Sequence, residues 1–292
     1  MASNIIEVTG QTQFTVDHYR SDEKPTWCPG CGDYGVLNAL YSSLRAKGLA
    51  PHDAVVVSGI GCSSRLPFFV STYGFHGLHG RTMPVATGLK AARPDTMVVV
   101  TGGDGDAFAI GGNHFIHAAR RNVDLTYIVM DNSIYGLTKG QTSPTSQTGF
   151  TTKTTPGGST DRAINPLLLA LTSGATFVAR GFSGQPKELT ELIQAGMEHK
   201  GFAVIDVFSP CTTWNKLNTF KYYREETERL PASHDPSNFS EAARLSALSD
   251  PLYLGVFYRE DVPTFEDGLE SHRSGSAEGT TLLLESLFDR FS

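Results

Sequence analysis

The chain has 292 residues, of which 39% are hydrophobic and 18% are charged, so it can bury the core of one large globular domain. Its formal net charge is −6 and its isoelectric point is near 5.8, which argues against general nucleic-acid binding because phosphate contacts need a basic surface. Residues 1–20 lack the continuous apolar core of a signal peptide, and no apolar run approaches the roughly 20 residues of a membrane helix. We therefore expect a cytoplasmic protein with no nucleic-acid or membrane partner.

Short apolar strands alternate with amphipathic helices along most of the chain. The pattern predicts strands at residues 54–57, 97–101, 125–130, 175–179 and 203–207. It predicts helices at residues 36–44, 108–121, 167–171 and 186–199, the first of them ended by Gly48. The strands are apolar throughout rather than alternating, which is typical of parallel strands buried between helix layers. The predicted fold class is therefore α/β, a doubly wound, mostly parallel sheet with helices on both faces.

Two stretches depart from this alternation. Residues 138–160 are rich in Thr, Ser and Gly and form a loop too long for a simple connection, which is typical of functional loops. After residue 220 the pattern weakens into a charged, proline-interrupted region with a strand-like run at 254–258 and an amphipathic helix at 282–291. We therefore predict a main domain over residues 1–220 and an irregular C-terminal arm over residues 221–292, which packs on that domain or on a partner subunit.

The chain has four cysteines, arranged as one CxxC pair, Cys28 and Cys31, and two single residues, Cys62 and Cys211. The length and composition do not indicate the small disulfide-rich fold of a secreted protein. Four thiolates at one site can bind zinc or a [4Fe-4S] cluster, and their spacing does not decide between the two. A thioredoxin-type redox pair is a further alternative, although no strand-like run precedes Cys28.

A second chemical signal follows the strand predicted at 97–101. Gly103, Asp104 and Gly105 come directly after it, and Asn132 follows the next predicted strand. Adjacent strand ends in a parallel sheet lie close together, and the helix N-termini beside them attract anions. Mg²⁺ prefers oxygen ligands, so Asp104, Asn132 and a nearby backbone carbonyl can hold Mg²⁺ against a diphosphate. Asp-Gly is also a common turn dipeptide, which is the ordinary alternative.

The spacing from Asp104 to Asn132 resembles the thiamine diphosphate and Mg²⁺ signature. Five further segments carry a more specific resemblance: CPGCG at 28–32, GIGCS at 59–63, HGR at 79–81, GLTKGQ at 136–141 and SPC at 209–211. Together they resemble the β subunit of 2-oxoacid:ferredoxin oxidoreductases over about residues 26–215. The resemblance is strongest to the 2-oxoglutarate type, and residues 254–260 share it.

The resemblance implies coenzyme A-dependent oxidative decarboxylation of 2-oxoglutarate to succinyl-CoA and CO₂, or the reverse reductive carboxylation. Electrons would pass from a thiamine-bound radical intermediate through one [4Fe-4S] cluster to ferredoxin, with thiamine diphosphate doing the carbon chemistry. The implied cluster ligands are Cys28, Cys31, Cys62 and Cys211, and the implied Mg²⁺ ligands are Asp104, Asn132 and the carbonyl of Ile134. The residues implied to contact thiamine diphosphate are Ile60, Gly61, Cys62, Ser63, His79, Gly103, Gly105, Asp106, Gly136, Leu137 and Thr138.

Lys139 is the one catalytic residue that the resemblance implies, facing the substrate carboxylate or coenzyme A. The ordinary alternative is that Lys139 is a solvated charge in a polar loop and that His79 is a core histidine. In this family a glutamate from another subunit activates thiamine, and the matched segments contain no glutamate that can replace it. We therefore expect an α subunit, an α₂β₂ assembly and no activity of this chain alone.

Three other functions remain open from the sequence. The chain can be the β subunit of a pyruvate or broad 2-oxoacid:ferredoxin oxidoreductase, because the side-chain pocket is partly built by the other subunit. A zinc-stapled, non-catalytic binding subunit accounts for the cysteines alone. A thiamine-dependent decarboxylase without redox chemistry accounts for Asp104 and Asn132 but gives the cysteines no role.

Overall fold

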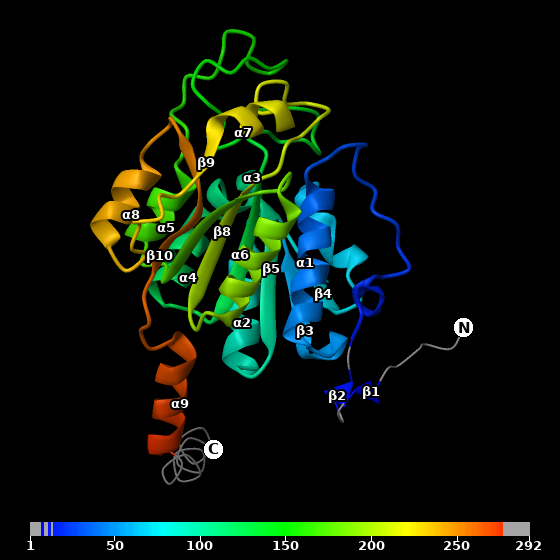
Figure 1. Ribbon diagram of the computed structural model, residues 1–292, viewed down its shortest axis with the longest axis vertical. Helices are drawn as coiled ribbons and strands as arrows, with labels where there is room; N and C mark the ends of the chain where they lie inside the picture. The colour runs from blue at the N-terminus through cyan, green and yellow to red at the C-terminus, as the bar shows by residue number, and fades with distance from the viewer. Residues whose placement is uncertain (1–6, 9–10, 13, 277–292) are drawn as a thin grey trace, which may run out of the picture.

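The computed structural model describes residues 7–8, 11–12 and 14–276, and its main feature is an eight-stranded sheet with helices on both faces (Figure 1). The strand order is β4-β3-β5-β6-β8-β7-β10-β9. The first six strands in this order run parallel, β10 is antiparallel to β7, and β9 is parallel to β10. The predicted doubly wound, mostly parallel α/β fold is confirmed.

The strands of the described residues are β1 (Glu7–Val8), β2 (Gln11–Thr12), β3 (Ala54–Ser58), β4 (Tyr73–His76), β5 (Met97–Gly103), β6 (Leu125–Asp131), β7 (Phe177–Phe182), β8 (Phe202–Phe208), β9 (Thr227–Arg229) and β10 (Leu252–Arg259). The α-helices are α1 (Asp33–Lys47), α2 (Thr82–Ala92), α3 (Asp104–Phe108), α4 (Gly112–Arg120), α5 (Pro166–Thr172), α6 (Pro186–Glu198), α7 (Phe220–Glu226), α8 (Phe239–Ser246) and α9 (Phe265–Ser276). Short 3₁₀ helices cover Val16–Tyr19, Pro51–Asp53 and Ser63–Phe69.

Each face of the sheet is covered by its own hydrophobic layer. On one face α1 and α6 pack side by side, and Leu40 and Ile193 are fully buried against the sheet. On the other face α2, α4, α5 and α8 form the second layer around Phe115. Burying one such side chain contributes about 1.5–3 kcal/mol, so the two layers fix the helices firmly to the strands. As predicted, α1 ends at Gly48, whose φ of 66° is the left-handed conformation that glycine adopts easily.

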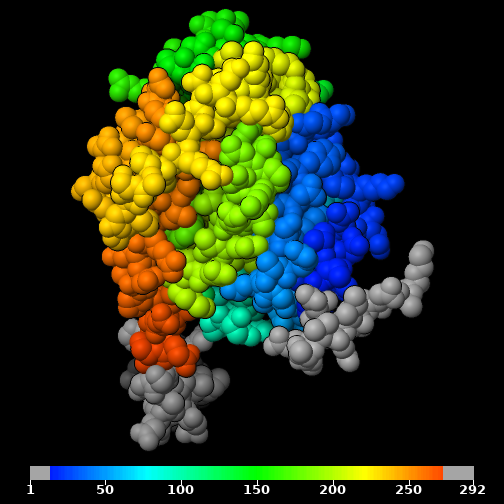
Figure 2. All heavy atoms as spheres, in the orientation of Figure 1, coloured from blue at the N-terminus to red at the C-terminus, as the bar shows by residue number. Residues whose placement is uncertain are grey.

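The carboxyl ends of four neighbouring strands bring the predicted site residues to one edge of the sheet. Cys62 follows β3, Asp104 begins directly after β5, Asn132 follows β6 and Cys211 follows β8. Because β3, β5, β6 and β8 are adjacent and parallel, these residues come together although they are up to 149 positions apart in the sequence. This edge lies at the top of Figure 1, and the space-filling view shows the segment around α7 and part of the preceding loops covering it (Figure 2).

The single helix predicted at 108–121 is wrong, because the chain forms α3 and α4 with a break at Ala109. The ψ of Ala109 is −109°, which is not helical. A Cβ on Gly111 would lie 2.2 Å from the carbonyl oxygen of Asp106, so the chain approaches itself here more closely than a side chain permits. The break directs α3 toward the carboxyl edge of the sheet, where Asp104 and Asp106 lie in its first turn.

The strand predicted at 175–179 is displaced, because β7 runs from Phe177 to Phe182. The predicted strand ends before Arg180, whose charge is unusual inside a buried strand. Arg180 is only 5% exposed, and its Nε donates to Oδ2 of Asp206 on β8 over 3.0 Å. The pairing of the two charges lets the strand continue through the core.

The region after residue 220 has more regular structure than the sequence pattern indicates. It contributes α7, β9, α8, β10 and α9, and β10 extends the central sheet through Arg259 by pairing with β7. The helix predicted at 282–291 lies outside the described residues. The division at residue 220 and a contact with a partner subunit stay predictions. Within residues 7–8, 11–12 and 14–276, no helix is long and apolar enough to cross a membrane.

Candidate active site

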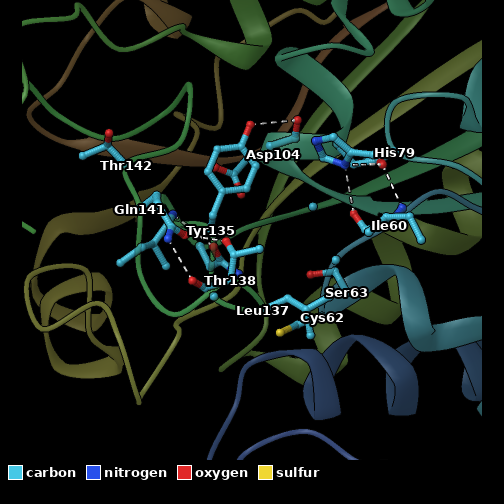
Figure 3. A pocket seen from close by; sticks show the side chains of 17 residues that line it. Ile60, Cys62, Ser63, His79, Asp104, Tyr135, Leu137, Thr138, Gln141 and Thr142 are labelled. Carbon is cyan, nitrogen blue, oxygen red and sulfur yellow. Dashed lines mark hydrogen bonds and ion pairs between the residues drawn. The ribbon is translucent and has the colours of Figure 1, made fainter. Parts of the chain in front are cut away.

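A cavity of about 490 Å³ opens at the carboxyl edge of the sheet (Figure 3). Its lining includes every residue predicted to contact thiamine diphosphate or Mg²⁺: Ile60, Gly61, Cys62, Ser63, His79, Gly103, Asp104, Gly105, Asp106, Asn132, Ile134, Gly136, Leu137 and Thr138. Tyr135, Gln141 and Thr142 complete the lining. The structure thus brings these residues together around one space, and their contact with a cofactor stays a prediction.

Asp104 lies at the inner end of the cavity and fits a cation site. The residue is 2% exposed, and none of the ion pairs in the described part of the chain involves it. Burial and the nearby Asp131 carboxylate raise the pKa of Asp104 well above its ordinary value. Asp104 is thus a buried carboxylate with a second carboxylate beside it and, among the described residues, no basic side chain paired with it. A divalent cation stabilises such an arrangement.

Asn132 and Ile134 supply the other oxygens of the predicted Mg²⁺ site. Both residues line the cavity with Asp104 and are at least 93% buried. The side-chain Oδ1 of Asn132 accepts from the Ile134 N–H over 3.1 Å, and Ser133 between them has a φ of 53°. This tight turn keeps both residues beside Asp104 in the cavity lining. One carboxylate with amide and carbonyl oxygens is a suitable donor set for Mg²⁺, which keeps several waters.

The long loop predicted to be functional, residues 138–160, reaches the same place. The hydroxyl oxygen of Thr145 lies 2.7 Å from Oδ2 of Asp104 and 2.7 Å from Oδ1 of Asp131. The Ser146 hydroxyl donates to the Ser133 carbonyl over 2.6 Å. Both contacts fasten the loop to the strand ends that carry Asp104 and Asn132. Thr145 is not among the predicted site residues, because nothing in its own neighbourhood distinguishes it from the other threonines of the loop.

Asp106 holds the loops that form the cavity. Its side chain is 1% exposed and accepts from the Ile60 N–H over 2.9 Å, the Gly80 N–H over 2.8 Å and the Thr82 hydroxyl over 2.7 Å. Its Oδ1 also lies 3.1 Å from Nδ1 of His79. Since the carboxylate is surrounded by protein donors, its main contacts are to the protein, although the residue lines the cavity as predicted. A Cβ on Gly59 would lie 2.2 Å from this carboxylate, so only glycine fits there.

His79 and Tyr135 lie next to each other in the lining of the cavity. The Asp106 carboxylate lies beside Nδ1 of His79, so Nδ1 carries a proton that points at this carboxylate. The rings of His79 and Tyr135 meet edge to face with centroids 6.0 Å apart, and both project toward the cavity in Figure 3. Burial, Asp104 and Asp106 raise the pKa of Tyr135 to about 12, so its hydroxyl stays protonated. The half-exposed position of His79 favours the cofactor interpretation over that of a core histidine.

The four cysteines meet beside the cavity, and none forms a disulfide. The Gly32 N–H donates to the Pro210 carbonyl over 3.0 Å, which joins the CxxC segment to the segment of Cys211. The Trp27 indole donates to the Cys62 carbonyl over 2.7 Å, which joins the CxxC segment to that of Cys62. Burial, Asp33 and the neighbouring cysteines raise the pKa of the Cys62 thiol to about 11.

The cysteine site does not have the geometry of a single-ion site. In the part of the chain that the structure describes, no three His, Cys, Asp or Glu side chains converge closely enough to hold one metal ion. Zinc needs four ligands about 2.3 Å from one point, whereas each cysteine of a [4Fe-4S] site binds a different iron and the sulfurs lie further apart. Four free thiols provide the right number of ligands for a [4Fe-4S] cluster, and the identity of the group that they bind stays a prediction. The irregular segment before Cys28 and the two additional cysteines also argue against a thioredoxin-type pair.

A tight turn at residues 135–141 borders both the cysteine site and the cavity. The Tyr135 N–H donates to the Gln141 carbonyl over 2.9 Å and closes the turn. A Cβ on Gly136 would lie 3.5 Å from the Cys211 sulfur and 3.7 Å from the Cys62 sulfur. Gly136 also lines the cavity, so one backbone residue borders both sites. Trp214 packs against this turn through Gly140.

Lys139 does not lie where a catalytic residue is expected within this chain. Its side chain is exposed and is absent from the cavity lining, although its neighbours Leu137, Thr138 and Gln141 are part of it. Its φ of 77° is the left-handed conformation, which is unusual for a residue with a side chain. The tight turn imposes this conformation. A role for Lys139 toward a substrate carboxylate or coenzyme A stays a prediction.

Asp33 is the functional candidate that sequence reasoning missed most completely. It is fully buried, and its carboxylate accepts from Ser209 over 2.7 Å and from Ser63 over 3.2 Å. Burial raises its pKa to about 6. The only sequence signal is its position two residues after Cys31, but its partners are 30 and 176 positions away and only the fold brings them together.

Comparison with known proteins agrees with this geometry. Residues 59–207 match the family described as "Thiamine pyrophosphate enzyme, C-terminal TPP binding domain". Residues 211–274 match the family described as the C-terminal part of the pyruvate ferredoxin oxidoreductase β subunit. The first segment begins directly after β3 and runs through β4 into β8, and the second begins at Cys211.

Curated relatives cover most of the chain. The 2-oxoacid:ferredoxin oxidoreductase subunit beta of Sulfolobus sp is 42% identical over 84% of this chain and 86% of its own length. The 2-oxoglutarate oxidoreductase subunit KorB of Mycobacterium tuberculosis is 48% identical over 76% of this chain and 59% of its own length.

A solved structure is also similar, the 2-oxoglutarate:ferredoxin oxidoreductase from Magnetococcus marinus with 2-oxoglutarate, coenzyme A and succinyl-CoA bound. It is 46% identical, with a TM-score of 0.90 over 92% of this chain and 93% of that chain. Sequence and fold thus agree along nearly the whole length. The chain belongs to the family of 2-oxoacid:ferredoxin oxidoreductase β subunits and is a subunit of an oxidoreductase.

Proposed function

We propose that this chain is the thiamine- and cluster-binding subunit of a 2-oxoglutarate:ferredoxin oxidoreductase. The reaction is the coenzyme A-dependent oxidation of 2-oxoglutarate to succinyl-CoA and CO₂, or its reductive reverse. The observation that carries the proposal is the position of Gly136, which borders both the cavity and the sulfurs of Cys62 and Cys211. Carbon chemistry in the cavity and electron acceptance at the cysteines are thereby separated by one backbone residue.

Each part of the cavity has a role in this proposal. Asp104, Asn132 and the Ile134 carbonyl would hold Mg²⁺, which would supply positive charge for the diphosphate of the cofactor. Asp106 positions the Ile60 and Gly80 segments and keeps the proton of His79 on Nδ1. Thiamine diphosphate supplies a carbon nucleophile and an electron sink for the decarboxylation.

The cysteine site provides the electron acceptor. We assign Cys28, Cys31, Cys62 and Cys211 as ligands of one [4Fe-4S] cluster, because all four thiols are free and the chain belongs to the ferredoxin oxidoreductase β subunits. Cys62 also lines the cavity, so it is the cysteine nearest to both reactions. Cys28 is exposed, which gives electrons a route toward a ferredoxin at the surface.

The preference for 2-oxoglutarate is supported by relatives. The KorB proteins of Mycobacterium tuberculosis and Methanocaldococcus jannaschii are named for 2-oxoglutarate, and the latter is 39% identical over 86% of this chain. The bound molecules in the Magnetococcus marinus structure are 2-oxoglutarate, coenzyme A and succinyl-CoA. A pyruvate or broad 2-oxoacid specificity is the second candidate, because the Sulfolobus relative is named only for 2-oxoacids.

The proposed assembly includes an α subunit, in an α₂β₂ complex located in the cytoplasm. No glutamate is among the residues that line the cavity in the described part of the chain. Activation of thiamine needs such a carboxylate beside its aminopyrimidine ring, so a partner must supply it. The partner would also bring the 2-oxoacid side chain and coenzyme A toward the turn that carries Lys139.

The test is an anaerobic assay of this chain purified with and without its α subunit. Reduction of ferredoxin or viologen is measured with coenzyme A and a panel of 2-oxoglutarate, pyruvate and branched-chain 2-oxoacids. We expect activity only in the complex and the highest kcat/KM with 2-oxoglutarate.

Each result bears on a separate part of the proposal. Activity of this chain alone would contradict the requirement for a partner carboxylate. A higher kcat/KM for pyruvate in the complex would favour the second candidate. A colourless, iron-free complex that contains zinc would contradict the assignment of the cysteines.

A further inference from the structure

Asp33 is a buried carboxylate at the centre of the cysteine site with no partner of opposite charge. It is 0% exposed and is the first residue of α1, two positions after Cys31. None of the ion pairs among the described residues includes it. Burying a carboxylate in this way costs free energy unless several donors stabilise it.

The donors of Asp33 come from the other cysteine segments. Ser209, two residues before Cys211, donates to Oδ1 over 2.7 Å. Ser63, directly after Cys62, donates to Oδ2 over 3.2 Å. One side chain therefore links the three chain segments that carry all four cysteines.

The negative charge of Asp33 also acts directly on the sulfurs. Asp33 is two residues from Cys31, and its hydrogen-bond donors are directly after Cys62 and two residues before Cys211, so its charge lies close to these sulfurs and repels negative charge on them. The same repulsion disfavours any added electron on a group bound to these sulfurs, because the surroundings are buried and screen charge poorly. Hydrogen bonds, burial and nearby charge are the factors by which a protein sets the potential of an iron–sulfur cluster.

We propose that Asp33 is a positioning residue that holds the three cysteine segments together and lowers the reduction potential of the cluster. This inference rests on the proposed function, since it assumes the [4Fe-4S] cluster. A carboxylate in the first turn of a helix also stabilises that helix through its dipole. That ordinary role predicts an effect on the stability of α1 and none on the potential.

The experiment compares the wild-type αβ complex with Asp33→Asn and Ser209→Ala, all purified anaerobically. Asp33→Asn removes the charge and keeps an oxygen acceptor, whereas Ser209→Ala removes one hydrogen bond and keeps the charge. Asp53→Asn is the matched control, because Asp53 is a half-exposed aspartate before β3, at the opposite edge of the sheet. Iron and sulfide content, the midpoint potential from an EPR-monitored titration, and the rate of iron loss to a chelator are measured.

We expect a more positive midpoint potential in Asp33→Asn and an unchanged potential in Asp53→Asn. We expect Ser209→Ala to lose iron to the chelator roughly tenfold faster than the wild type does. This factor is the lower end of the effects observed when a residue that supports a metal ligand is replaced. If Asp33→Asn retains no cluster, the rate of iron loss from Ser209→Ala tests the positioning role instead. A faster rate than in the wild type supports this role, and a rate equal to that of the wild type overturns it.

The failure of this inference differs from the failure of the proposed function. The inference alone is overturned if the wild type contains the cluster, Asp33→Asn has the same midpoint potential, and Ser209→Ala loses iron at the same rate. A wild-type complex without iron overturns the proposed function and the inference with it.

Discussion

Asp106 illustrates how a residue near a cofactor site acts mainly through the protein. Its two oxygens accept from Ile60, Gly80 and Thr82 and face His79, so the carboxylate determines where two cavity loops lie. Asp106 can contact thiamine diphosphate directly, or it can act by positioning these loops. The two roles predict different results when Asp106 is replaced. A contact residue affects only binding, whereas a residue that positions loops also affects stability.

We expect Asp106→Asn to weaken thiamine diphosphate binding by about tenfold or more and to lower the melting temperature. The wild-type carboxylate has two acceptor oxygens for its donors, whereas the amide has only one. Each hydrogen bond to a charged group contributes about 1.5–3 kcal/mol, so the loss affects both binding and stability. Isothermal titration with thiamine diphosphate and Mg²⁺ and thermal unfolding measure the two effects. Asp95→Asn is the control, since Asp95 is exposed and pairs only with Arg93. Unchanged stability with weakened binding would favour the direct contact instead.

Cys62 is a cysteine that also lines the cavity, so the proposed function gives it a place beside both reactions. Its replacement by serine should abolish ferredoxin reduction and lower the iron content, because a hydroxyl is a poor substitute for a thiolate ligand. Iron analysis and the visible spectrum of the anaerobic complex measure the loss. Ser64→Ala is the matched control two positions away, because the Ser64 hydroxyl has no hydrogen-bond partner among the described residues. Full activity of Cys62→Ser would contradict the assignment.

At the scale of elements, the strands were more predictable than the turns between them. Uniformly apolar runs identified β3, β5, β6 and β8, because strands buried on both faces leave few positions for polar residues. The break between α3 and α4 was not predictable, since it depends on the close approach of Gly111 to Asp106. The length of β7 was underestimated for a similar reason, because the partner of Arg180 is on another strand.

The end of α6 contains a histidine whose titration should be visible in the stability of the fold. His199 is 3% exposed, and its Nε2 lies 2.7 Å from the Thr176 hydroxyl at the start of β7. Burial, and then the charge of Arg259, lower the pKa of His199 below the ordinary value of 6.5. Below pH 6.5 the unfolded chain therefore binds this proton more readily than the folded chain does. The stability contributed by neutral His199 is complete above pH 6.5 and is lost as the pH falls further.

We expect the His199→Gln variant to lose less of its free energy of unfolding between pH 7.5 and pH 5.5 than the wild type does. Denaturant unfolding at the two pH values measures the difference. His52→Gln serves as the control, because it replaces an exposed histidine by the same residue. Equal losses in the wild type and His199→Gln would show that the buried ring does not titrate differently in the folded state.

For the whole molecule, motif spacing indicated which residues form the site but not how they are supported. The cysteines, Asp104 and Asn132 belong to short motifs at strand ends, so a parallel sheet was enough to bring them together. Asp33 and Thr145 have no motif of their own. Their function depends on side chains from distant segments, such as Ser209, which is 176 positions from Asp33. Such contacts follow from the complete fold and not from any local pattern.

The whole molecule also explains why one chain can join two kinds of chemistry. Four adjacent parallel strands end at the same edge, and each delivers one part of the site: Cys62, Asp104, Asn132 and Cys211. The turn at residues 135–141 borders both the cavity and the cysteine site at that edge. The open side of the cavity is left for a partner subunit in the proposed assembly.

The central claim is that electrons released in the cavity pass to a cluster at the cysteines of the same chain. The most direct measurement is the EPR spectrum of the anaerobic αβ complex, loaded with thiamine diphosphate and Mg²⁺, before and after 2-oxoglutarate and coenzyme A are added without ferredoxin. We predict about one [4Fe-4S] cluster per β chain and the appearance of a reduced-cluster signal on addition of the substrates. A complex with no cluster would contradict the claim, and so would a cluster that the substrates do not reduce in a complex that forms succinyl-CoA once ferredoxin is supplied.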